Sequence, residues 1–492
     1  MKPNTKRAFS LILIGILSAG TFACGGEKPS GDDTTAPSNG ETSSEDTAPA
    51  YVYPDVDLKG DTFTILNTAQ TYGFYSNLDF EEATGDTLND AIYDRNRNLE
   101  ERFKFNLEIN EEYTLDKAAK ALETSVLAGD DTYDVAFIRD YYLNTALTEG
   151  YLADIDGIPE IQLDKPWWDG AATENARVGK SKKALFASTD VSLVDFEGTI
   201  VWFFNEDMLS KLKLDTPYQL VLDGKWTFDK MTEYMKSGAN LNGDENYMPF
   251  KTDGNAVYGL SGFQHTYNSL ISSAGVDYID LDKDGNLVFG ADNEKFYNAA
   301  IKISQTFAQD GDYIFANNGV APGDDGHYEM IFKNGRALML SAQLKAANFY
   351  RDMDATYGIV PVPKWDESQE NYSNLRTFSY LMVIPVTNNR QHETGAIMDA
   401  MSYITYEKVM PAFYNGRISQ KILRNDESIA MMNIIRSSRH YDLGTIYGLY
   451  NDFSNKISTI INQKSTDFSS MVASYKPTIE KNLESLMTAM DK

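Results

Sequence analysis

The sequence has few residues that form covalent cross-links or metal sites. Its 492 residues include one cysteine, Cys24, and four histidines. A single cysteine excludes a disulfide within the chain, so packing must stabilise the fold. The histidines lie far apart and lack the short spacing of zinc ligands, so we expect neither a metal nor a cofactor. They are His265, His327, His392 and His440.

Basic residues, long apolar runs and catalytic motifs are also scarce. The chain has 44 Lys and Arg against 72 Asp and Glu, a formal charge of −28, which argues against a nucleic-acid partner. No segment reaches the roughly 18 consecutive apolar residues of a transmembrane helix. The GxSxG, P-loop and HExxH patterns of common enzyme classes are absent, so we expect no catalytic activity.

The first residues have the pattern of an export signal. Lys2, Lys6 and Arg7 precede an interrupted apolar run over 9–19, and small residues lead to Cys24. The segment 21–25, Thr-Phe-Ala-Cys-Gly, resembles a bacterial lipobox, with Thr21 where leucine is usual. We therefore predict a lipoprotein signal peptide over 1–23 and a lipid on Cys24. The alternative is an unmodified thiol in a signal that is cut elsewhere.

Residues 24–50 have the composition of a tether. Almost all are Gly, Ser, Thr, Asp, Glu, Pro or Ala, which cannot bury a core. A flexible coil of this length spans roughly 25 to 30 Å. We expect a disordered tether here, although an ordinary disordered terminus would have the same composition.

The body of the chain begins near residue 51 with alternating strand and helix patterns. Apolar periodicity predicts helices over 87–102, 115–128 and 206–213, and β-branched or aromatic runs predict strands over 59–67, 103–109, 133–139, 184–189 and 199–204. The strand at 59–67, the helix at 87–102 and the strand at 103–109 follow one another and form a βαβ unit. This alternation predicts the α/β class.

Further helices are predicted in the second half. Thr227 precedes an apolar-periodic run and can cap the helix that begins there, while Trp226 is placed to pack against that helix. Helical periodicity recurs at 293–309, 395–405, 427–437 and 478–490.

Two loops rich in aspartate were considered as calcium sites. The loop 280–291 begins like an EF-hand but ends in Ala291, where a bidentate Glu is required. It is better interpreted as a hairpin that turns at Asp284 and Gly285. The loop 240–251 has oxygen donors but no central glycine, and it ends in Lys251.

Several blocks in order resemble the bacterial extracellular solute-binding proteins of ABC importers, in the branch that binds sugars and oligosaccharides. No single block is specific, but their order and spacing are. The blocks are TYDVAFIRDYYLNTALTEGYLADI at 132–155, WFFNEDMLSKLKL at 202–214, KWTFDKMTEYMK at 225–236, YEMIFKNGRALMLSA at 328–342, YGIVPVPK at 357–364 and FSYLMVIPVTNN at 378–389.

The resemblance implies a two-lobed, periplasmic-binding-protein-like α/β fold with hinge strands between the lobes. Lobe one would comprise 51–192 and 326–387, and lobe two 193–325 and 388–492. The implied protein is a monomer, held by its lipid at the extracellular face of the cell membrane. It would capture a small solute, most plausibly a carbohydrate, and deliver it to ABC permease subunits.

Two other functions remain open on the sequence alone. A surface glycan-active hydrolase could hide its paired carboxylates among the 72 acidic residues. A sensor or adhesin that does not transport could use the same fold. Peptide-like or other polar solutes are the alternative to sugars.

Aromatic residues make up 12% of the chain, led by 30 tyrosines, and aromatic rings suit the apolar faces of sugars. Candidate ligand contacts therefore lie where aromatic and polar side chains follow predicted strand ends or fall in the crossing regions. Surface or core packing is the alternative role for each of them. The candidates are Tyr72, Phe74, Tyr75, Arg139, Asp140, Tyr141, Tyr142, Trp167, Trp168, Asp190, Asp195, Glu197, Trp365 and Tyr380.

Overall fold

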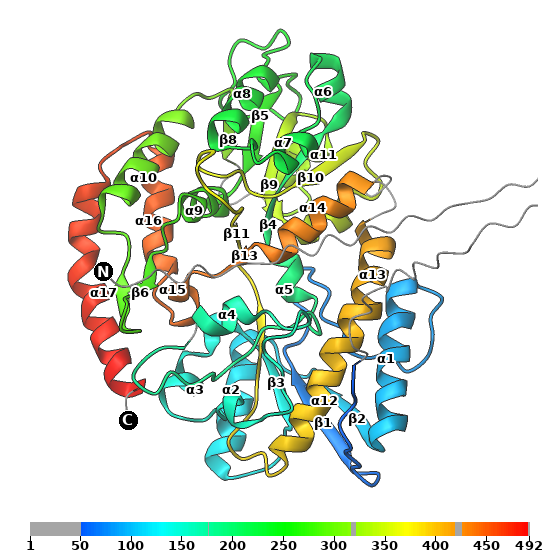
Figure 1. Cartoon of the computed structure of the whole chain (residues 1–492). Coiled ribbons are helices and arrows are strands. Elements are labelled where there is room, and N and C mark those ends of the chain that lie inside the picture. Colours follow the sequence, from blue (N-terminus) through cyan, green and yellow to red (C-terminus); the bar gives the residue numbers. More distant parts are fainter. Residues whose placement is uncertain (1–50, 176, 316–320, 419–425, 491–492) are drawn as a thin grey trace, which may run out of the picture. The chain divides into compact units, whose positions relative to one another are not determined.

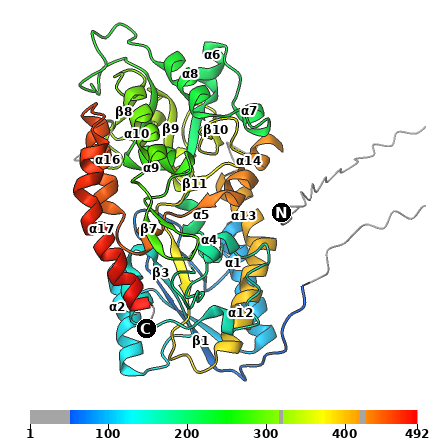
Figure 2. The same ribbon diagram turned by 60° about the vertical axis from the view of Figure 1, so that its left-hand side comes forward.

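The computed structural model describes residues 51–490, except 176, 316–320 and 419–425. The predicted signal peptide, Cys24 and the tether lie outside these residues. Figures 1 and 2 show the described part from two sides.

A four-stranded sheet contains the first strands of the chain, in the order β12-β3-β1-β2. Strand β1 pairs in parallel with both β2 and β3, and β12 runs antiparallel to β3. Helix α1 lies between β1 and β2 in sequence, so the predicted βαβ unit is confirmed. The strands are β1 (Thr62–Asn67), β2 (Asn106–Asn110), β3 (Val135–Arg139) and β12 (Tyr380–Val383).

A five-stranded sheet has the order β10-β4-β9-β5-β8. Strand β5 pairs in parallel with β8 and β9, whereas β4 is antiparallel to both β9 and β10. Its strands are β4 (Ile200–Asn205), β5 (Tyr258–Gly262), β8 (Tyr313–Phe315), β9 (Ala337–Gln343) and β10 (Tyr357–Val360). Two short pairs complete the strands: β6 (Ile279–Leu281) with β7 (Leu287–Phe289), and β11 (Asn374–Leu375) with β13 (Arg439–His440).

Helices cover both sheets, with α1 and α2 against the first and α8 and α9 against the second. The helices are α1 (Thr87–Phe103), α2 (Leu115–Ala128), α3 (Asn144–Thr148), α4 (Gly170–Asn175), α5 (Val194–Glu197), α6 (Glu206–Leu212), α7 (Tyr218–Leu222), α8 (Phe228–Gly238), α9 (Gln264–Ser273), α10 (Glu294–Thr306), α11 (Tyr328–Lys333), α12 (Gln391–Ile404), α13 (Met410–Phe413), α14 (Asp426–Ser437), α15 (Leu443–Ile446), α16 (Asn451–Asn462) and α17 (Phe468–Met490). Among the 3₁₀ helices, η1 (Asp140–Tyr142) and η3 (Leu344–Tyr350) follow β3 and β9.

Local chemistry explains the element ends that the sequence predicted well. Thr227 caps α8 by accepting a hydrogen bond from the Lys230 amide, and Trp226 is fully buried, as expected. The loop over 280–291 is the predicted hairpin, since β6 and β7 are antiparallel and Gly285 takes a positive φ of 86°.

Other element predictions were wrong. No named strand covers 184–189, where only Ala187 forms an isolated bridge, to Met382. The strand expected from residue 103 begins at Asn106, because α1 continues through Phe103 and Lys104 then turns left-handed. Helix α17 begins ten residues before the predicted 478 and continues through Pro477.

The sheets divide the middle of the chain differently from the predicted lobes. The prediction assigned 326–387 to lobe one. Within that segment β12 does join the four-stranded sheet, but β9 and β10 pair with β4 in the five-stranded sheet. In the other direction, α12 was expected in lobe two, yet it packs against α1.

Candidate functional site

A cavity of about 530 Å³ lies where strand ends of both sheets meet. Its volume is in the range of small-molecule binding sites. The residues that line it are Tyr72, Phe74, Arg139, Tyr141, Phe263, Gln264, His265, Asn268, Tyr328, Gln343, Lys345, Thr377, Phe378, Thr445, Tyr450 and Asn451.

The carboxyl ends of parallel strands place these side chains. Arg139 is the last residue of β3 and Gln343 is the last residue of β9, while Phe263 directly follows β5. Tyr72 and Phe74 lie in the loop after β1. Ligands of open α/β sheets bind at this edge, where loops after the strands converge.

Aromatic rings from the four-stranded side form one wall of the cavity. The rings of Phe74 and Phe378 stack with centroids 4.3 Å apart, and the Tyr72 ring meets Phe378 edge-on at 5.9 Å. Tyr72 is 68% exposed, which is high for so large a side chain beside a core. These rings contribute apolar surface to the lining of the cavity.

A second aromatic group comes from the five-stranded side. The rings of Phe263 and Tyr328 stack at 5.8 Å, and His265 meets Tyr328 edge-on at 5.6 Å. Burial lowers the pKa of His265 to about 4, although its ring nitrogen Nε2 hydrogen-bonds the Ser341 carbonyl at 2.9 Å. His265 is therefore neutral at physiological pH.

Two cationic side chains line the same cavity. The Arg139 guanidinium donates to the Thr377 carbonyl at 3.1 Å and pairs with Asp140. Burial lowers its pKa to about 10. Lys345 Nζ donates to the Tyr72 carbonyl at 2.6 Å, and burial lowers its pKa against the opposing effect of Glu329. A pKa of about 10 leaves Arg139 charged at neutral pH.

A family model for bacterial extracellular solute-binding proteins matches residues 97–416, which is more than half of the chain. The chain belongs to this family. The match confirms the resemblance found in the sequence blocks. No curated protein matches the sequence.

Solved structures of solute-binding proteins share the fold at low sequence identity. An ABC substrate-binding protein of Listeria monocytogenes, in complex with cycloalternan, is 12% identical; the match covers 88% of this chain and 99% of that one, with a TM-score of 0.51. The maltose-binding protein MalE of the same species, in complex with maltose, is 14% identical. The match covers 88% of this chain and 97% of that one, with a TM-score of 0.52. The GacH receptor of Streptomyces glaucescens, solved unliganded and with acarbose, is 13% identical. The match covers 86% of this chain and 99% of that one, with a TM-score of 0.51. The predicted two-lobed α/β fold is confirmed.

Of the predicted site residues in this solute-binding protein, four line the cavity. They are Tyr72, Phe74, Arg139 and Tyr141, which all follow or end strands of the four-stranded sheet. Tyr141 also lines a neighbouring cavity of about 330 Å³, next to α2.

Candidates near the cavity serve the surrounding structure instead. Asp140 pairs with Arg139 and accepts a hydrogen bond from the Tyr141 amide. Glu197 accepts hydrogen bonds from the Tyr75 amide at 2.7 Å and from Asn348. Both carboxylates are buried and hold the loops that present the lining residues.

Three tyrosine candidates also lie outside the lining. The hydroxyl of Tyr75 donates a hydrogen bond to Asn89, Tyr142 lines only the neighbouring cavity, and the hydroxyl of Tyr380 forms a hydrogen bond with that of Thr71.

The three tryptophan candidates do not line the cavity. Trp167 and Trp168 both donate their ring N–H to Asp399 on α12, at 3.0 and 2.7 Å. Trp365 packs against Phe228 with ring centroids 4.9 Å apart. These contacts hold the loop of Trp167 and Trp168 against α12, and the loop of Trp365 against α8.

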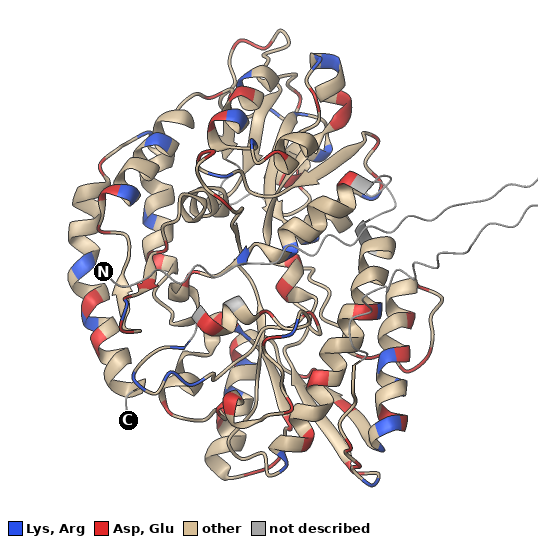
Figure 3. Cartoon of the chain, in the orientation of Figure 1, with Lys and Arg blue, Asp and Glu red and all other residues tan. Residues whose placement is uncertain are grey.

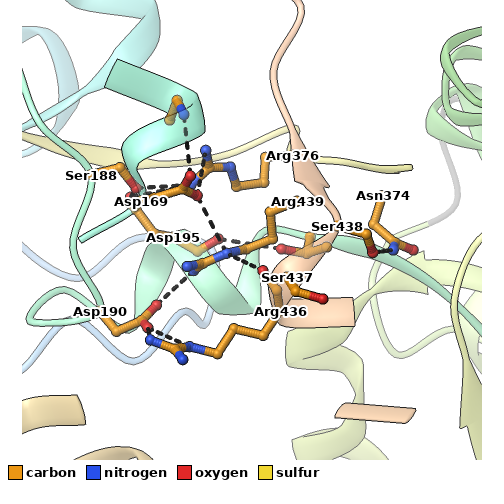
Figure 4. Close-up of polar contacts among 12 residues, drawn as sticks. Asp169, Ser188, Asp190, Asp195, Asn374, Arg376, Arg436, Ser437, Ser438 and Arg439 are labelled. Atoms are coloured by element: carbon orange, nitrogen blue, oxygen red, sulfur yellow. Dashed lines mark hydrogen bonds and ion pairs between the residues drawn. The ribbon is translucent and has the colours of Figure 1, made fainter. Parts of the chain in front are cut away.

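Asp190 and Asp195 belong to a buried network of ion pairs (Figure 4). Asp190 contacts Arg436 at 2.7 Å and Arg439 at 2.6 Å. Arg376 reaches Asp195 at 3.7 Å and Asp169 at 3.2 Å. Through Arg436 and Arg439, the network joins α14 and β13 to the residues just before β4. It links parts of the chain that are distant in sequence.

Sequence reasoning missed most of the lining on the five-stranded side. Strand β5 was not predicted, so Phe263, Gln264 and His265 were not recognised as residues after a strand end. Lys345 lies three residues beyond the block at 328–342 that carried the family resemblance. Extending the strand-end rule past that block would have found Gln343 and Lys345.

Within the part of the chain that the structure describes, no group of three or more His, Cys, Asp or Glu is placed to hold a metal ion. The described helices include none long and apolar enough to cross a membrane.

Proposed function

We propose that this protein captures an extracellular carbohydrate as the substrate-binding component of an ABC importer. The observation that carries the proposal is the cavity at the strand ends, with a stacked aromatic pair from each sheet and hydrogen-bonding side chains between them. Aromatic faces pack against sugar rings, while amide, hydroxyl and cationic groups bind the hydroxyls.

Ligands seen in proteins of the same fold support a sugar over a peptide. The structures compared above contain cycloalternan, maltose and acarbose. Tyr141 lines this cavity and also a smaller neighbouring one, so it stands between the two.

The lobes of this proposal follow the observed sheets. Lobe one would comprise about 51–192 and 376–418, and lobe two about 193–375 and 426–490. A sugar that touches lining residues of both sheets favours the closed arrangement of the lobes, because it binds that arrangement with more contacts. The closed form would dock on the permease and perform no chemistry itself.

We further propose that the protein acts at the outer face of the cell membrane as a monomer held by a lipid on Cys24. The export pattern and the lipobox support this placement. Membrane fractionation of cells that express the full chain or Cys24→Ser tests it. The anchor is contradicted if both forms sediment equally with membranes.

A calorimetric and thermal-shift screen tests the function. Purified protein is mixed with malto-, cello- and xylo-oligosaccharides, acidic oligosaccharides and short peptides. A ligand that binds only the folded state stabilises it and so raises the melting temperature. At a free ligand concentration of 100 times its Kd, the stabilisation is about 2.7 kcal/mol. We expect a saccharide to bind and to be recovered intact.

Phe263→Ala removes one stacked ring and is expected to weaken binding by about 5- to 150-fold, since stacked aromatic contacts contribute about 1 to 3 kcal/mol. Phe349→Ala is the matched control, because Phe349 is partly exposed and lies outside the lining. Binding of peptides alone, or cleavage of a glycan during incubation, would overturn the proposal.

A further inference from the structure

The charges that line the cavity differ in sign from those of the protein as a whole. The chain carries 72 acidic against 44 basic residues, and the acidic ones are spread over helices and loops of both sheets (Figure 3). The described lining residues nevertheless have Arg139, His265, Lys345 and tyrosines as their ionisable groups. The described lining contains no Asp or Glu, and its basic side chains are Arg139 and Lys345.

Each cation lies over one ring of the stacked pair on the four-stranded side. Lys345 Nζ is 4.2 Å from the centre of the Phe74 ring, and the Arg139 guanidinium carbon is 3.8 Å from the centre of the Phe378 ring. The two rings stack on each other at 4.3 Å. The four side chains therefore form one stack, and all of them line the cavity, so a ligand bound there lies close to both cations.

The two cations are not equally neutralised. Arg139 pairs directly with the buried Asp140. The described contacts of the Lys345 ammonium are the Tyr72 carbonyl and the Phe74 ring, neither of which carries a formal charge. Glu329 and Glu197 affect the Lys345 ammonium only through longer-range electrostatic attraction, which raises its pKa. An ammonium has three N–H donors, so Lys345 can donate to a ligand while it keeps its bond to Tyr72.

We propose that the natural ligand is an acidic saccharide and that Lys345 binds its carboxylate. A partly buried ammonium gains more from a carboxylate than from a neutral hydroxyl, because a charge-assisted hydrogen bond is roughly twice as strong as a neutral one. This inference rests on the proposed function and narrows it to one class of sugar.

Matched pairs of ligands isolate the carboxylate. Oligosaccharides of galacturonate, and xylo-oligosaccharides that carry glucuronate, are compared with their methyl esters, which keep every ring but remove the charge. Neutral oligosaccharides complete the panel. Affinities are measured by calorimetry at low and high salt, because salt screens the attraction between charges.

Lys345→Gln removes the charge and keeps an N–H donor. Lys333→Gln is its control, since Lys333 also lies 4.2 Å from the centre of a phenylalanine ring, that of Phe349, but outside the lining. We expect the acid to bind at least about tenfold more tightly than its ester. Lys345→Gln should abolish that difference, and Lys333→Gln should leave it unchanged.

Equal binding of acid and ester, or preference for a neutral sugar, would overturn the inference and leave the proposed function standing. Failure of every saccharide to bind would overturn both. If Lys345→Gln does not fold, the acid and ester pairs on the unmodified protein, with their salt dependence, decide the question.

Discussion

Asp190 is a buried carboxylate held between two guanidinium groups. Burial alone would raise its pKa, but the charges of Arg439 and Arg436 lower it well below the ordinary value of 3.8. Its side chain is 4% exposed, so solvent screens these contacts little. A residue predicted to touch a ligand is instead part of the link between the two halves of the fold.

Asp190→Asn is expected to lower the free energy of unfolding at pH 7 by about 3 to 5 kcal/mol, because it removes the buried carboxylate that pairs with both Arg436 and Arg439. A depressed folded pKa contributes stability above the unfolded pKa, and this is lost as pH falls toward the folded pKa. The deficit of the variant should therefore shrink below about pH 4. Urea unfolding at pH 7 and pH 3 measures it.

Asp164→Asn is the control for this prediction, since Asp164 is 77% exposed and pairs only with Lys165 beside it. It should change the free energy of unfolding by less than about 0.5 kcal/mol at both pH values. A pH-independent deficit in Asp190→Asn would show that the lost contribution is packing and not charge.

At the scale of elements, the end of α5 and the loop just before β12 approach closely. A Cβ atom on Gly198, the residue after α5, would lie 1.9 Å from the Phe378 carbonyl oxygen. The Thr377 amide also donates to the Gly198 carbonyl at 3.1 Å. This contact sets the position of Phe378, which forms part of the cavity wall.

Gly198→Ala is expected to displace the segment that carries Phe378 and to destabilise the protein by about 1 to 3 kcal/mol. Affinity for the bound saccharide should fall as well, because the stacked pair of Phe74 and Phe378 is disturbed. Thermal unfolding and calorimetry measure the two effects. Gly157→Ala is the control, since a Cβ there meets no atom within 4 Å. An unchanged affinity in Gly198→Ala would contradict the assigned role of Phe378.

At the scale of the whole described molecule, the chain connects the two sheets more than once. It passes from β3 to β4, returns from β10 to β12, and the pairing of β11 with β13 brings a later segment back to the crossing. The cavity is lined from both sheets. A bound ligand should therefore restrain strand ends that are far apart in sequence.

Hydrogen exchange tests this expectation. Saturation with the saccharide is expected to slow amide exchange over 139–143 and also over 263–268 and 343–345. Exchange in the middle of α1, which lies away from the lining, should not change. The same protein without ligand serves as the unbound reference. Protection limited to segments of one sheet would contradict a ligand held between the two.

The sequence predicted elements well where local signals decide them. Thr227 caps α8, and the Asp284 and Gly285 turn joins β6 to β7, because both depend on residues within one turn. The strand expected at 184–189 did not form, because tertiary contacts of Ser188 and Asp190 hold that segment. Helix α17 is longer than predicted, because it packs on α10 and α16 and continues through Pro477, where a helix is expected to be interrupted.

The candidate site could be predicted only in part. Tyr72, Arg139 and Tyr141 follow strands that the sequence revealed, so the strand-end rule located them. Phe263 was missed because strand β5 was not predicted, and Lys345 was missed because the strand-end rule was not applied beyond the block at 328–342. The buried tryptophans bind Asp399, a partner more than 200 residues away, and no local pattern indicates that contact.

Tyr141 lines both the cavity at the strand ends and the smaller one beside α2. Its position on the short helix η1 is outside both sheets. Exchanging this one ring for a smaller side chain would join the two spaces without altering a strand or a crossing. Under the proposed function, a single codon change would then alter the length of the saccharide that fits, while the strands and crossings stay the same.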